Sequence, residues 1–197
     1  MATRTARPPA GAAAALPGLH APAAGFDEPF ALLDACHDRV RRSLALLGRL
    51  AAHLRQRGAD AAARDAAQDV LRYFSQAAPA HHEDEERHVL PLLQASGDPA
   101  LQVLARRLLD DHADIRRAWS ALEPQLRALA TGLAVDAEAM HVAAADFLRA
   151  HDGHLEREDG LAFPAAARLA AAQPGQRAAM GREMAARRGV AWPPTGG

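Results

Sequence analysis

Two short motifs pair a histidine with a glutamate at helical spacing. His81 is followed by Glu85 and His154 by Glu158, each at four residues, and a proline stands ten residues after each histidine. Residues i and i+4 lie about 40° apart around a helix and about 6 Å apart along it. Each imidazole should therefore point the same way as its carboxylate, an arrangement that could bind a metal ion.

Two further histidines occur in a second repeated pattern. His37 and His112 are each followed by two residues, an apolar residue and two arginines, and each lies on an apolar helical stripe. A single histidine in such a stripe is usually an ordinary core residue, and a single His-x3-Glu pair is often a solvent-exposed pair. Because all four stripes carry a histidine and both motifs repeat, the joint pattern favours a metal site.

The combined set contains four imidazoles and two carboxylates. Such donors, without thiolates, suit iron, manganese or zinc. Two ions fit this set better than one, because each ion could take two imidazoles while the two carboxylates bridge the pair. Carboxylates on a buried stripe would also be costly without a cation as partner.

Four long amphipathic segments must position these residues. Apolar residues recur at steps of three and four within each segment, and capping or helix-breaking residues separate the segments. We expect helices that begin near Asp27, Asp60, Asp98 and Asp136 and end near Gly58, Ser96, Gly132 and Pro174, with Asp27 as the N-cap of the first helix. Pro79 should kink or loosen the second helix just before His81. The sequence predicts an all-α fold, an antiparallel up-down-up-down four-helix bundle with an internal pseudo-two-fold repeat.

At these residues the sequence resembles the hemerythrin-like, or HHE cation-binding, family. The resemblance covers about residues 27–170 and depends on His37, the run His81 to Glu86 with Pro91, His112, and the run His154 to Glu158 with Pro164. It implies a four-helix bundle with a non-haem di-iron centre. The implied imidazole ligands are His37, His81, His112 and His154, and the implied bridging carboxylates are Glu85 and Glu158.

Some positions differ from the oxygen-carrying hemerythrins. Those proteins have a second histidine one turn along the third helix, where this chain has Arg116. Their last carboxylate corresponds to Asp159, which is therefore an alternative to Glu158. A site with two histidines for each iron is more open than a carrier's site, so this chain is more similar to bacterial members linked to oxygen, nitric oxide or peroxide response, or to repair of iron centres.

Other histidines and acids near the motifs have less specific roles. His151 is the best candidate for an extra ligand or for a group that supports a ligand. His88, at the edge of the stripe, could also support a ligand. Several neighbours should face water or orient the ligands, namely His82, Glu83, Asp84, Glu86 and Arg87. The remaining histidines look like ordinary surface residues, namely His20, His53 and His141.

Composition limits the classes of protein. A hydrophobic content of 49% with only 4% aromatic residues favours helix, and a net charge of −1 does not suit a nucleic-acid partner. The single cysteine, Cys36, fits a reducing compartment, and no apolar run is long enough for a membrane span, so we expect a cytoplasmic protein without a membrane partner. The expected divisions are a disordered tail (1–25), the bundle (26–172), and a short helix with a tail (173–197).

The expected function is that of a metal-binding protein. It would hold two non-haem irons, with manganese or zinc as alternatives. The irons would bind or react with dioxygen, nitric oxide or peroxide, in a stress response or in iron handling. Whether the protein is an enzyme stays open. The alternative is a non-enzymatic iron- or oxygen-responsive sensor whose metal mainly stabilises the bundle and whose protein partner is unknown. A ferritin-like oxidase fits less well, because that class places the acid before the histidine in Glu-x2-His pairs.

Overall fold

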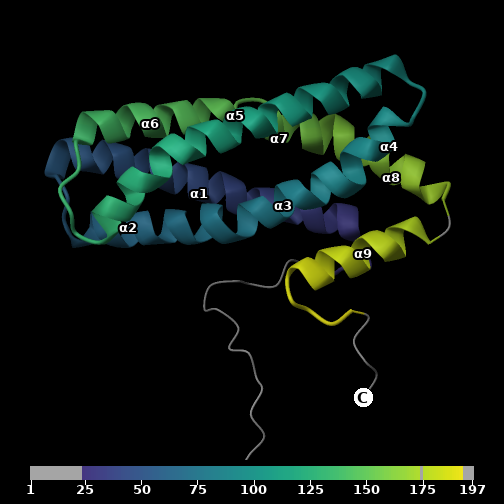
Figure 1. Cartoon of the computed structure of the whole chain (residues 1–197), viewed down its shortest axis with the longest axis horizontal. Helices are drawn as coiled ribbons and strands as arrows, with labels where there is room; N and C mark the ends of the chain where they lie inside the picture. The colour runs from purple at the N-terminus through teal and green to yellow at the C-terminus, as the bar shows by residue number, and fades with distance from the viewer. Residues whose placement is uncertain (1–23, 174, 193–197) are drawn as a thin grey trace, which may run out of the picture.

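The computed structural model describes residues 24–173 and 175–192, and that part of the chain is helical without a strand (Figure 1). The all-α prediction is therefore confirmed. Most of the expected N-terminal tail, residues 1–23, and the last five residues lie outside the described residues. The helices are α1 (Pro29–Arg57), α2 (Ala61–Arg72), η1 (Tyr73–Ala77), α3 (Ala78–Asp84), η2 (Glu85–Val89), α4 (Leu90–Gln94), α5 (Pro99–Ala130), α6 (Ala137–Ala150), α7 (His154–Arg157), η3 (Glu158–Ala162), α8 (Phe163–Ala171) and α9 (Gln176–Arg187).

Three of the four expected helix starts are confirmed. The side chains of Asp60, Asp98 and Asp136 each accept hydrogen bonds from backbone N–H groups of the first turn, which have no partner within the helix. The expected N-cap at Asp27 is wrong, because α1 begins one residue later, with Glu28 as the N-cap. Pro29 occupies the first helical position and disfavours the helical conformation of the residue before it.

The long helices contact one another in a ring. Helix α1 packs against α2 and α6, and α5 packs against the same two helices. The segments from α2 to α4 and from α6 to α8 thus lie between α1 and α5 (Figure 1). Helix α9 lies beside this group and contacts α1 and α8.

Two of the segments depart from regular α-helix. Pro79 follows the π-helical turn η1, which agrees with the expected loosening before His81. The fourth segment is not one continuous helix as predicted. It is interrupted after α6, where Gly153 adopts a left-handed conformation with φ of 67° and begins α7. The sequence pattern missed this break because the apolar stripe continues on both sides of it.

The hydrophobic core consists of two clusters separated by a polar layer. Along α1, Leu33 belongs to one cluster and Val40 to the other, and His37 lies between them. Along α5, Leu108 and Ile115 belong to the same two clusters and flank His112 in the same way. The sequence therefore interrupts the core at one level on each helix, which brings the histidines together.

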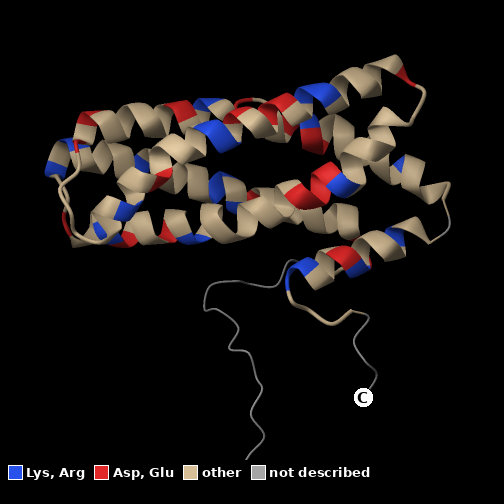
Figure 2. Ribbon diagram, in the orientation of Figure 1, with Lys and Arg blue, Asp and Glu red and all other residues tan. Residues whose placement is uncertain are grey.

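Basic and acidic segments are interspersed along the helices in the view of Figure 2. That pattern agrees with a net charge of −1 for the whole chain. No helix within the described ranges combines the length and hydropathy needed to cross a lipid bilayer.

Candidate metal centre

The six predicted ligands lie together in the polar layer. All are buried, with exposed fractions between 0% and 3%. They come from four segments and are His37, His81, Glu85, His112, His154 and Glu158. Both glutamates occupy the first residue of a π-helical turn, η2 or η3, and such turns are frequent at functional sites.

One group of donors surrounds a first potential ion position. His37, His81, Glu85 and Glu158 each offer one donor atom, and these atoms lie within 4.8 Å of one another. The Nε2 atoms of His37 and His81 are 3.0 Å apart, and His37 Nε2 is 3.2 Å from a Glu158 oxygen. His81 Nε2 is 2.9 Å from Glu85 Oε1.

The same two carboxylates reach a second pair of imidazoles. His112 Nε2 lies 3.5 Å from Glu85 Oε2 and 3.6 Å from Glu158 Oε1. His154 Nε2 lies 3.2 Å from Glu158 Oε2. Each carboxylate therefore lies between two pairs of imidazoles, as a bridging ligand would.

The unsatisfied atoms of this layer fit a cation. None of the four oxygens of Glu85 and Glu158 has a hydrogen-bond partner within the described part of the chain, and neither do His112 Nε2 and His154 Nε2. Buried carboxylates that face only neutral imidazoles and make no hydrogen bond cost roughly several kcal/mol when they stay ionised. Bound cations would remove this cost, and imidazole and carboxylate are donors that iron accepts.

Two imidazoles are held from behind by matching groups. His37 Nδ1 donates to Asp159 Oδ1 at 2.5 Å, and Arg41 pairs with the same carboxylate. In the neutral ring this bond fixes the tautomer and leaves the lone pair on Nε2, the nitrogen that faces Glu85 and Glu158.

The second of these imidazoles is His112. Its Nδ1 donates to Glu86 Oε1 at 2.9 Å, and Arg116 binds that oxygen at 2.7 Å. Glu86 follows Glu85 in the sequence just as Asp159 follows Glu158. Arg116, where oxygen carriers have a histidine, therefore helps to hold the imidazole of His112 through Glu86.

Comparison with known proteins identifies the family. The hemerythrin HHE cation-binding domain matches residues 28–166. The chain belongs to this family. An uncharacterized protein of Haemophilus influenzae is similar, with 31% identity over 138 residues that cover 70% of this chain and 78% of the relative. The predicted family resemblance is confirmed, and cation binding follows from it.

Acids and imidazoles compete for protons at the centre of this HHE domain. Burial opposes a charge on each ring. At His154 burial prevails and lowers the pKa, whereas at His37 and His112 the neighbouring carboxylates outweigh it. Glu158 and Glu85 raise the pKa of His37 to about 9, and Glu158 and Glu86 raise that of His112 to about 9. A metal ion needs the neutral rings, so cation binding must displace protons from them.

The remaining two histidines of the HHE domain, His81 and His154, adjoin different groups. Asp111 Oδ2 lies 3.6 Å from His154 Nδ1 and accepts a hydrogen bond from Arg157 at 2.7 Å. His81 instead adjoins Cys36: burial works to raise the pKa of this thiol, but the imidazole contact leaves it below its ordinary value.

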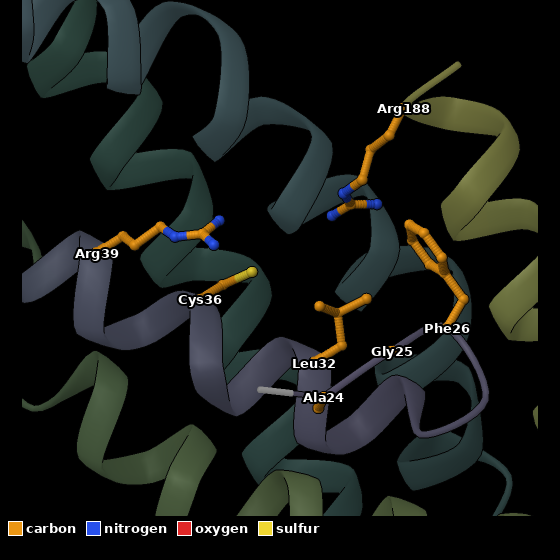
Figure 3. Close-up of a pocket in the computed structure, with 7 residues that line it drawn as sticks. All are labelled: Ala24, Gly25, Phe26, Leu32, Cys36, Arg39 and Arg188. Carbon is orange, nitrogen blue, oxygen red and sulfur yellow. The ribbon is translucent and has the colours of Figure 1, made fainter. Parts of the chain in front are cut away.

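Cys36 also borders a cavity of about 260 Å³ beside α9. The close-up in Figure 3 shows the sulfur between the side chains of Arg39 and Arg188, with Phe26 closing one side. The thiol thus adjoins both His81 and this cavity.

Several other predicted groups lie away from the donor atoms. His151 donates from Nδ1 to the Phe147 carbonyl at 2.9 Å and packs among aromatic rings. His88 faces α9, 3.4 Å from Glu183. Asp159, the alternative bridging carboxylate, instead supports His37 from outside. His20 lies outside the described residues.

Three groups near the centre were not singled out from the sequence. His82 was expected to face water or orient ligands, and its ring stacks on His112 with centroids 4.3 Å apart. Glu86 was given the same expectation, and it accepts the hydrogen bond from His112; Arg41 was given no role. A signal was present, since an acid follows each motif glutamate and an arginine stands four residues after each lone histidine.

Proposed function

We propose that the chain holds two iron ions bridged by Glu85 and Glu158, and that it binds or reacts with a small ligand such as dioxygen, nitric oxide or peroxide. The observation that carries this proposal is the set of unpartnered carboxylate oxygens facing four imidazoles inside the core. A stress response or iron handling is the role that such a protein would have.

The proposed ligand sets are His37 with His81 for one ion and His112 with His154 for the other. The ring of helices would be the predicted antiparallel four-helix bundle, and the two sets would be related by its pseudo-two-fold repeat. Two imidazoles and two shared carboxylates do not fill the six positions of octahedral iron, so a small ligand could bind. Iron would supply redox chemistry and open positions.

The residues of this chain would orient the imidazoles and keep water away from the site. Asp159 and Glu86 hold the rings of His37 and His112 in the orientation that binding requires. The two flanking apolar clusters limit the access of water to the layer. A dry site strengthens each electrostatic interaction within it.

Metal analysis with spectroscopy tests the proposal. We would express the protein in iron-supplemented medium, measure metal per chain, and record absorbance before and after adding azide, nitric oxide or peroxide. We expect two irons per chain and a charge-transfer band that changes with azide. A protein without metal, or with one spectroscopically silent zinc, would overturn the di-iron proposal.

A second candidate function, a metal-responsive sensor, is favoured by the contacts of α9. Arg187 and Arg188 each reach one oxygen of Asp84 at 2.6 Å, and Asp84 is fully buried. Asp84 directly precedes the proposed bridging ligand Glu85. Metal occupancy could therefore alter how firmly α9 is held, and a partner could recognise that difference.

Limited proteolysis tests the sensor candidate. Gly181 lets α9 approach the segment that precedes α1, because a Cβ there would lie 1.9 Å from the Phe26 carbonyl oxygen. A Gly181→Val variant should therefore release α9 and expose its arginines to trypsin. If α9 responds to metal, removing iron from the natural protein should increase cleavage in the same way. Equal cleavage with and without iron would exclude the sensor candidate.

A further inference from the structure

His82 lies beside only one of the two imidazole pairs. Nitrogen atoms of His82, His112 and His154 lie within 4.8 Å of one another, and the side chain of His82 is half-buried. The described part of the chain offers neither of its ring nitrogens a hydrogen-bond partner. A polar group thus stands at the edge of the core without a protein partner, next to two proposed ligands.

The ring geometry argues against His82 as a third ligand there. Its plane is inclined by only 18° to that of His112, and the rings are stacked. The lone pair of an imidazole lies in the ring plane, so two stacked rings cannot both direct lone pairs at one ion. The proposed ligand pair His112 and His154 is inclined by 71°, which lets the two nitrogens converge.

Within the described part of the chain, the second motif has no imidazole at the position that matches His82. The position 73 residues after His82 is Leu155, which stands in the second motif where His82 stands in the first. Leu155 is only 6% exposed and belongs to the apolar core. A polar donor is therefore available on the side of His112 and His154 through His82, whereas the matching position offers only a hydrocarbon.

We propose that His82 donates a hydrogen bond to a small anionic or diatomic ligand bound at the His112–His154 ion, and that this ion is the one at which such ligands bind. This inference rests on the proposed di-iron function. Azide, nitric oxide and hydroperoxide each have an outer atom that accepts a hydrogen bond. A donor already in place, in a site with little water, favours the ligand that can accept it.

Variants of His82 separate hydrogen bonding from packing. His82→Phe keeps an aromatic ring to stack on His112 but has no N–H group, and His82→Gln restores a donor. The matched control is Leu155→Met, a change of similar volume at the corresponding position. The probe is azide added to iron-loaded protein, with iron per chain, the azide dissociation constant and the infrared stretch of bound azide as readouts.

We expect all variants to retain two irons. His82→Phe should weaken azide binding about tenfold, the effect of one hydrogen bond to a charged group, and shift the azide stretch. His82→Gln should recover part of both, and Leu155→Met should match the natural protein.

Two results would overturn the inference alone. Equal azide affinity and stretch in all iron-loaded variants would exclude a hydrogen bond from His82. Loss of iron from both His82 variants would make His82 a ligand instead. If the natural protein bound no iron or gave no azide response, the proposed function would fail, and this inference with it.

Discussion

The two imidazole pairs are alike close to the carboxylates and differ farther out. In each pair one histidine donates to an acid that an arginine also binds. These matching triads are His37–Asp159–Arg41 and His112–Glu86–Arg116. The second histidine of each pair differs, since Asp111 lies behind His154 and Cys36 lies beside His81.

This comparison indicates which parts of the site are general and which are particular. The matching groups orient ligands, a requirement that any cation would impose. The differing groups, a thiol against a carboxylate and His82 against Leu155, would make the two ions unequal. Loss of a shared group should therefore affect metal binding more than a change in one of the differing groups.

Removing one ligand from either pair should have the largest effect. We expect His81→Ala and His154→Ala each to lose most of the bound iron and to lower the free energy of unfolding by about 2–4 kcal/mol, because a cavity and unpaired carboxylates remain. Metal analysis and urea unfolding measure both effects. His141→Ala is the control and should change neither. Equal metal content in all three variants would refute the assignment of the site.

Removing the acids of the two triads should have the next largest effect. Asp159→Asn and Glu86→Gln keep the size of the side chain but weaken the support of His37 and His112. We expect each to lower iron affinity roughly 10- to 100-fold, as measured in competition with a chelator. Asp114→Asn, which alters an exposed pair with Arg117, should have no effect. A large loss in only one of the two acid variants would show that the triads are not equivalent.

The sequence predicted the position of the proposed ligands better than that of their supports. An apolar stripe interrupted by a histidine at one level on each helix can be recognised by counting residues. His37 and His112 therefore lie where helical periodicity places them. Glu86 and Asp159 lie beside the stripe, where periodicity alone suggests solvent.

Local backbone geometry explains much of the remaining difference between the predicted helices and those of the structure. Glu85 and Glu158 each begin a π-helical turn, and the extra residue in such a turn rotates the next part of the helix relative to a regular α-helix. The break at Gly153 similarly changes the path between His151 and His154. Neither feature has a clear periodic signal, so continuous helices were the natural prediction.

Replacing Cys36 by aspartate should make the outer supports of the two pairs more alike. The new carboxylate would adjoin His81 as Asp111 adjoins His154, and Arg39 and Arg188 beside the cavity would favour its charge. We expect iron affinity to rise about tenfold, by the effect of an anionic support on a ligating imidazole. Cys36→Ser controls for loss of the sulfur and should stay near the natural value. A fall in affinity for Cys36→Asp would mean that the thiol contact is the better support.

The smallest expected effect concerns His151, which stands where the first motif has Ala78, 73 residues earlier. Burial lowers the pKa of His151 to about 4, against an ordinary value of 6.5. Between these values the unfolded chain binds more protons than the folded one, so stability is present above pH 6.5 and falls as the pH falls toward 4. When the pH falls from about 7 to 6, the free energy of unfolding of the metal-free His151→Phe variant should fall by about 0.7 kcal/mol less than that of the natural protein. Urea unfolding measures both values. Because the other histidines are common to both proteins, equal losses in the two would show that His151 is not held neutral by burial.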